Sequence, residues 1–199
     1  MKRAPFLVAL FLAALALRPQ LVGIGPLLPA VQDDLDVTHA VAGLLGTIPV
    51  LCMGLFAPPA PFLSGRIGAR LAIAAALALI GLFGVARAVA PGAVAVIVRT
   101  FPVGVGMGLA GAMLPVAVKQ RFADRPGFAT AVYTSGITIG SALAATVAVP
   151  LSRAAGGWRT PLLVFGAVST VLAAVWLWLT RSELPHERVD ARPLRLPLL

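Results

Sequence analysis

The sequence predicts an all-α, polytopic membrane protein whose six transmembrane helices form two inverted three-helix repeats. Hydrophobic residues make up 59% of the 199 residues, which is too high a share for an ordinary soluble domain. Six apolar stretches are long enough to cross a bilayer, which takes about 20 residues. A motif of Arg18 and Val22-Gly23-Ile24-Gly25 also returns as Arg99 and Val103-Gly104-Val105-Gly106. Such a repeat, in segments that cross in opposite directions, is typical of inverted repeats.

The expected spans lie near 6–30, 40–62, 70–90, 93–117, 127–150 and 159–180. Together they predict one transmembrane bundle over residues 1–180, followed by a cytoplasmic, linker-like tail at 181–199. The start Met1-Lys2-Arg3 also resembles a secretory signal peptide, but the apolar stretch behind it continues as far as Val31.

The distribution of Lys and Arg predicts the orientation. One side of the membrane, formed by the N-terminus, the second and fourth loops and the tail, holds eleven basic residues: Lys2, Arg3, Arg66, Arg70, Lys119, Arg121, Arg125, Arg181, Arg188, Arg192 and Arg195. The loops on the other side hold only Arg87, Arg153 and Arg159. We therefore expect both termini on the cytoplasmic side of the inner membrane. Trp176 and Trp178 would then lie at the inner headgroups, where such rings anchor helices.

The first span contains a permanent charge, Arg18. A guanidinium inside a bilayer is costly, so we expect Arg18 to face the bundle interior or a wet cavity. On an uninterrupted helix Arg18, Val22, Gly25 and Pro29 would share one face.

The later spans differ in character. Span three has no polar side chain from Leu71 to Ala86 and is expected to face lipid. Span six also has few polar side chains in its middle. Spans one, two, four and five are rich in Gly, Pro and polar residues, which favours a cavity between them. In span five, helix packing and cavity lining both remain possible for the Gly136–Gly140 pair and for the hydroxyls of Thr134, Thr138 and Ser141.

Composition also excludes function classes. The net charge of +9 is scattered between apolar stretches, which argues against nucleic-acid binding. Cys52 is the single cysteine, so the chain has no internal disulfide framework and no cysteine metal cluster. The predicted spans contain no Asp or Glu, and His39 and His186 lie in loops. An intramembrane enzyme is therefore disfavoured, and no cofactor or metal is implied.

Several motifs carry a family resemblance. They are Leu17-Arg18-Pro19, the segment 22–29 (VGIGPLLP) and the segment 42–58 (AGLLGTIPVLCMGLFAP). On these motifs the chain resembles the N-terminal half of a major facilitator superfamily transporter, and within it the cyanate and 2-nitroimidazole transporter branch. The signature of the loop between spans two and three is matched at Leu63, Arg66, Gly68 and Arg70, whereas Pro61, Gly65 and Ala69 depart from it. The span-four signature is matched at Arg99, Gly104, Gly106 and Gly108.

The resemblance implies half of a twelve-helix carrier that works by alternating access on a small anionic, nitro-bearing or cyanate-like solute. It implies three partners: the lipid bilayer, the solute, and a second six-helix half or another copy of the chain. A non-transporting accessory subunit and an inactive fragment are the alternatives. Candidate solute-binding residues are Arg18, Gly25, Arg99, Tyr133, Thr134 and Thr138, and candidate residues of a conformational loop are Arg66, Gly68 and Arg70. For Arg18 and Arg99 a purely structural role is the alternative.

Overall fold

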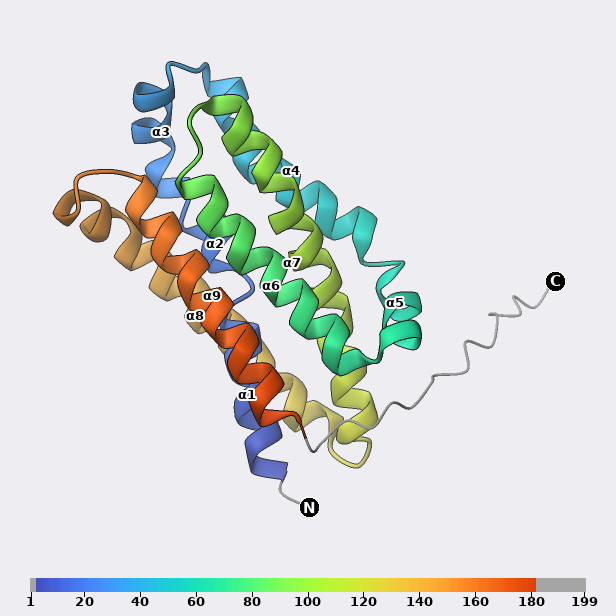
Figure 1. The fold of residues 1–199 in the computed structure, drawn as a ribbon. Helices are drawn as coiled ribbons and strands as arrows, with labels where there is room; N and C mark the ends of the chain where they lie inside the picture. Colours follow the sequence, from blue (N-terminus) through green and yellow to red (C-terminus); the bar gives the residue numbers. More distant parts are fainter. Residues whose placement is uncertain (1–2, 182–199) are drawn as a thin grey trace.

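The computed structural model describes residues 3–181 and is helical throughout that range apart from its connections (Figure 1). The elements are α1 (Arg3–Leu15), α2 (Pro19–Val22), the 3-10 helix η1 (Gly25–Leu27), α3 (Leu28–Leu35), α4 (His39–Phe56), α5 (Ala60–Ile67), α6 (Ala69–Ala88), α7 (Ala93–Arg121), α8 (Pro126–Ala154) and α9 (Arg159–Leu179).

Six segments of the described chain are long and apolar enough to cross a membrane. The first, Ala4–Leu35, comprises α1, α2, η1 and α3, and the other five are α4, α6, α7, α8 and α9. Figure 1 shows them running up and down one elongated bundle, with the α3–α4 connection at one end and the α7–α8 connection at the other. The all-helical membrane fold expected from the sequence is confirmed.

The first span is broken, so the expectation of one continuous helix is wrong. α1 ends at Leu15, four residues before Pro19, and α2 ends at Val22, four residues before Pro26. A proline removes a backbone donor, and its ring clashes with the carbonyl four residues earlier. Arg18 and Gly25 therefore do not lie on one face of a single helix.

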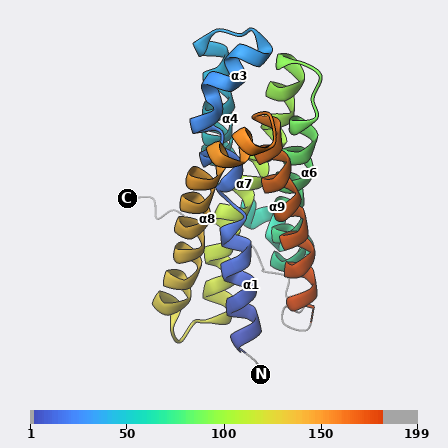
Figure 2. The ribbon, with the colours of Figure 1, turned by 90° about the vertical axis from the view of Figure 1, so that its left-hand side faces the viewer.

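The six spans form two three-helix units, spans one to three and spans four to six. The contacts between spans are repeated when each span is replaced by its equivalent in the other unit. α1 packs on α8, and the equivalent pair α7 and α4 packs as well. α6 packs on α7, and the equivalent pair α9 and α1 packs too, while α6 and α9 pack on each other. This equivalence is the arrangement that an inverted repeat produces, and Figure 2 shows α1 beside both α8 and α9.

Glycines permit the closest crossings. A Cβ atom at Gly136 of α8 would lie 2.6 Å from the Phe11 oxygen of α1, and one at Gly140 would collide with the backbone of Leu15. On α7, a Cβ atom at Gly108 would lie 2.8 Å from the Cys52 oxygen of α4. The packing interpretation of the Gly136–Gly140 pair is therefore confirmed.

The expectation that span three faces lipid is wrong for about half of the helix. Half of the most apolar window of α6 is buried, against 22% for α4 and for α8. Small side chains explain the difference, because Gly81 and Gly84 let α6 approach α9, and Ala76 packs beside Gly106 of α7. The absence of polar side chains indicated burial against protein here, not only contact with lipid.

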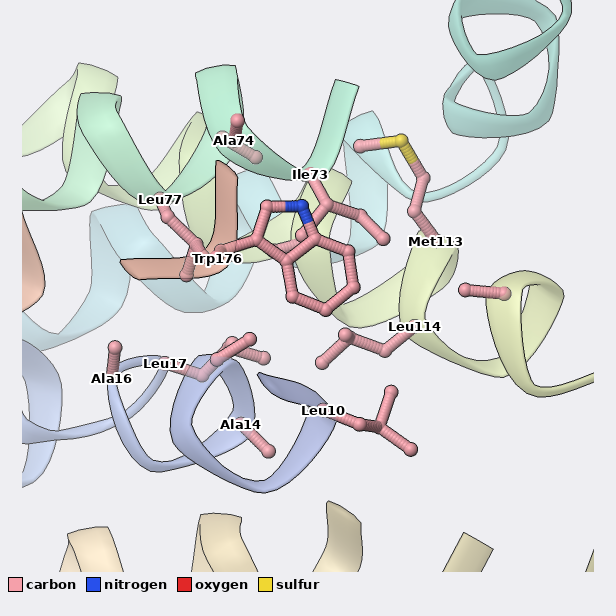
Figure 3. Close-up of a cluster of buried hydrophobic side chains, with 14 of the residues drawn as sticks. Leu10, Ala14, Ala16, Leu17, Ile73, Ala74, Leu77, Met113, Leu114 and Trp176 are labelled. Atoms are coloured by element: carbon pink, nitrogen blue, oxygen red, sulfur yellow. The ribbon is translucent and has the colours of Figure 1, made fainter. Parts of the chain in front are cut away.

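The main core lies among α1, α6, α7 and α9, around Trp176 (Figure 3). In this view the indole lies between Ile73 and Leu77 of α6 and Leu17 of the α1–α2 junction. Trp176 is 1% exposed, and its indole N–H donates to the Arg70 carbonyl at 3.0 Å. The expectation that Trp176 anchors in the headgroups is therefore wrong, whereas Trp178 is 62% exposed.

Two boundaries differ from the sequence interpretation. The second span ends at Phe56, and α5 is a separate short helix that begins after Pro58 and Pro59. The expected tail, 181–199, lies outside the described residues except for Arg181.

We expect Gly136→Ala to destabilise the protein by about 1–3 kcal/mol, because the added methyl group meets backbone that cannot yield. The measurement is the thermal unfolding temperature of the purified protein in detergent. Gly43→Ala on α4 is the matched control, since a Cβ atom there meets nothing within 4 Å. Equal unfolding temperatures for both variants would contradict the packing role of Gly136.

Candidate functional site

A cavity of about 330 Å³ opens between the first, second, fourth and fifth spans. Its lining comes from the α1–α2 junction, from the end of α4, from α7 and from α8, as the sequence had predicted for these spans. The lining residues are Leu17, Arg18, Met53, Ala57, Met107, Gly108, Gly111, Ala112, Tyr133, Thr134 and Ile137.

The lining is mostly apolar, and its polar side chains are Arg18, Tyr133 and Thr134. Among the residues that the structure describes, no acidic side chain lines the cavity. One fixed positive charge in an apolar surround attracts an anion, because the low dielectric strengthens its field. The cavity is therefore suited chemically to a small molecule with a negative or strongly electron-rich group.

Arg18 lies at the break between α1 and α2, where it is the N-cap residue of α2. Its carbonyl accepts hydrogen bonds from the backbone N–H groups of Leu21 and Val22 at 3.0 and 2.9 Å. Its half-buried guanidinium has no hydrogen-bond or ion-pair partner within residues 3–181. The donors of Arg18 are therefore open to a ligand in the cavity.

Tyr133 and Thr134 line the α8 wall of the same cavity. The Thr134 hydroxyl donates within its own helix, to the Thr130 carbonyl, so its oxygen can only accept from a ligand. The Tyr133 hydroxyl has no partner in the described chain and can donate. The two walls together offer a cation, a donor and an acceptor.

Other candidate residues lie away from this cavity. Gly25 is exposed in η1 with open space beside it. Thr138 is exposed, and its hydroxyl donates to the Thr134 carbonyl at 3.0 Å. Arg99 is half-buried and donates to the Ala86 carbonyl at 2.6 Å, near the end of α6. This contact favours the structural alternative for Arg99.

The candidate loop residues lie at the far end of the bundle. Arg66 is exposed and stacks on Phe62 at 4.5 Å. Gly68 separates α5 from α6 with a φ of 81°, a backbone conformation that favours glycine. Arg70 donates to the Leu177 carbonyl at 2.7 Å and to the Thr180 hydroxyl at 3.2 Å, which fastens the start of α6 to the end of α9.

Sequence reasoning missed a second arginine inside the bundle. Arg87 was expected in a loop, but it is 0% exposed at the end of α6. Its guanidinium donates to the Gln20 side-chain oxygen at 2.7 Å, to the Gln20 carbonyl, and to the Thr100 hydroxyl at 3.4 Å. Gln20 in turn donates to the Leu162 carbonyl of α9 at 2.9 Å. We call Gln20, Arg87 and Thr100 the buried network.

A sequence signal for the buried network exists in Gln20, an amide in the middle of an apolar span that needs a partner. Gly84, one turn before Arg87, provides the space, because a Cβ atom there would lie 2.7 Å from the Gln20 amide carbon.

A separate cluster fastens the α3 end of the bundle. Asp34 pairs with Arg159 at 3.3 Å and accepts from the Trp158 indole at 3.0 Å. Arg159 also donates to the Ala90 carbonyl at 2.6 Å. These contacts connect the first, third and sixth spans at one end and lie apart from the cavity.

Comparisons with known proteins agree on one family. A model described as Major Facilitator Superfamily matches residues 6–198. The chain is 28% identical to the uncharacterized transporter YycB of Bacillus subtilis, 28% identical to the cyanate transport protein CynX of Escherichia coli, and 30% identical to the 2-nitroimidazole transporter of Escherichia coli. These matches cover 92%, 96% and 91% of this chain, and 44%, 50% and 46% of the relatives. The chain therefore spans about half the length of the curated relatives it matches.

Proposed function

Since the chain belongs to the Major Facilitator Superfamily, we propose that it forms the N-terminal half of an alternating-access transporter and holds a small anionic, nitro-bearing or cyanate-like solute at Arg18. Its relatives are transporters, not enzymes. The observation that carries the proposal is the Arg18 guanidinium, which has no partner in the described chain and faces a cavity without acidic side chains.

The size and chemistry of the cavity support the solute class. A volume of about 330 Å³ is at the small end of ligand pockets. A guanidinium is planar with forked donors, which matches two oxygens of a nitro or carboxylate group better than an ammonium does. Two of the relatives are named for cyanate and for 2-nitroimidazole, which are small and offer a negative charge or the partially negative oxygens of a nitro group.

The proposal includes a partner, either a second six-helix half or another copy of this chain. α4 and α8 both contribute to the cavity wall, and both are the least buried spans, at 22% of their apolar windows. Large apolar side chains are exposed on them, namely Val50, Leu51, Leu55, Ile139, Leu143 and Val147. A partner seated on α4 and α8 would close the cavity and provide the second bundle that alternating access needs.

We also propose the inner membrane as the location, with both termini cytoplasmic. The excess of Lys and Arg at the N-terminal end of the bundle supports this orientation.

Arg18→Gln is expected to weaken solute binding by roughly tenfold to a hundredfold, since a lost charged hydrogen bond costs about 1.5–3 kcal/mol. Arg18→Lys keeps the charge but loses the fork, so its loss should be smaller. Isothermal titration of the assembled transporter with cyanate and with 2-nitroimidazole measures both effects.

Arg99→Gln is the matched control, because Arg99 is bonded to the Ala86 carbonyl outside the cavity. The Arg99→Gln variant should have a lower thermal unfolding temperature than the parent. The fraction of this variant that folds should bind the solute with the parental affinity. Unchanged binding by Arg18→Gln, with lost binding by well-folded Arg99→Gln, would show that the two roles are reversed.

The chain alone is expected not to transport, because alternating access requires two bundles around a shared site. Uptake of radiolabelled cyanate or 2-nitroimidazole into proteoliposomes should appear only when a second half, or a self-associated copy, is present. Saturable uptake by protein that crosslinking shows to be monomeric would refute this. An accessory subunit would show neither uptake nor solute binding in any assembly.

We expect His39 and Ala123 to lie on opposite faces of the membrane. Both residues are exposed; His39 is the first residue of α4, and Ala123 lies between α7 and α8. In a Cys52→Ala background, His39→Cys should react with an impermeant thiol reagent on intact cells, whereas Ala123→Cys should react only after the membrane is opened. The reverse result would overturn the proposed orientation.

A further inference from the structure

We propose that Gln20 and Arg87 are positioning residues: they hold the break between α1 and α2 in the conformation that turns Arg18 into the cavity. This inference rests on the proposed function, because it gives the buried network a purpose at the Arg18 site. The argument begins with the backbone of the break.

The break cannot hold its own shape. α2 has only four residues, and an isolated helical turn is unstable because nucleation fixes several dihedrals for one hydrogen bond. In an apolar environment the carbonyls that the break releases must also find donors. Two side chains supply donors at the two ends of α2: Ser169 of α9 donates to the Ala16 carbonyl before it at 3.3 Å, and Arg87 of α6 donates to the Gln20 carbonyl, which the end of α2 leaves free.

Three hydrogen bonds hold Gln20, and two of them come from Arg87. Its amide nitrogen donates to the Leu162 carbonyl at 2.9 Å, its side-chain oxygen accepts from Arg87 at 2.7 Å, and its backbone carbonyl accepts from Arg87 as well. Gln20, Arg87 and Thr100 are each 0% exposed. The buried network therefore connects the broken first span to α6, α7 and α9.

Fixing Gln20 fixes the direction of Arg18. The two residues belong to the same turn, in which the Arg18 carbonyl accepts from the N–H groups of Leu21 and Val22. No protein group within residues 3–181 forms a hydrogen bond with the Arg18 guanidinium. The direction of this side chain is therefore set by the backbone conformation at Arg18. A change in the buried network would therefore move Arg18 more than the lining residues on α4, α7 and α8.

The test measures access to position 18 directly and needs no solute. In the assembled Cys52→Ala transporter, Arg18→Cys should react with a small water-soluble methanethiosulfonate reagent in the cavity. Adding the pair Gln20→Leu and Arg87→Met should slow this reaction by about tenfold, as expected for coupling of a kcal/mol or two. The double substitution removes the polar side chains of Gln20 and Arg87 together. Removing both should preserve folding better than removing one and leaving the other buried without its partner.

Thr134→Cys is the matched reporter, because residue 134 lines the same cavity from α8 and has no contact with the buried network. Its reaction rate should stay within about twofold of the parental rate when the pair is added. A selective loss at position 18 supports the positioning role. Unchanged rates at both positions, or an equal fall at both, would overturn it. Because the reporters need no solute, this outcome is independent of whether Arg18 binds cyanate or 2-nitroimidazole.

Discussion

The structure depends on one constraint: a carbonyl released inside an apolar span must find a donor without water. Pro19 and Pro26 interrupt the first span, and the resulting break would be untenable in an isolated helix. Arg87 and Ser169 provide donors from α6 and α9, one helix from each three-helix repeat. The break is therefore a property of the whole bundle, and the Arg18 cavity lies beside it.

Arg87 and Arg18 have different roles, and the difference follows from their burial and their hydrogen-bond partners. Arg87 is fully buried, and its two terminal guanidinium nitrogens donate to Gln20 and Thr100 within the protein. Arg18 is half-buried and without a partner in the described residues, beside an apolar cavity. The same side chain thus stabilises structure in one place and is available for recognition in another.

The six spans could be predicted from apolar length, and the cavity helices from their glycine and polar content, because both are local properties. Arg87 could not be placed, since its partner Gln20 is distant in the sequence. The burial of Trp176 likewise depends on packing against α1 and α6. Proline alone did not identify the break, because α7 continues through Pro102 and Pro115. Of the six candidate solute-binding residues, Arg18, Tyr133 and Thr134 line one cavity, whereas Gly25, Arg99 and Thr138 lie elsewhere.

Within residues 3–181 no acidic side chain lines the cavity beside Arg18, which has an electrical consequence. Moving one elementary charge through a membrane potential of 100 mV involves about 2.3 kcal/mol, or roughly a fiftyfold concentration ratio. In a cell that is negative inside, this voltage opposes the entry of a monovalent anion and favours its exit. Accumulation of such an anion against this voltage would therefore require a coupled positive charge, and no cavity-lining residue within 3–181 is a carboxylate that could carry one.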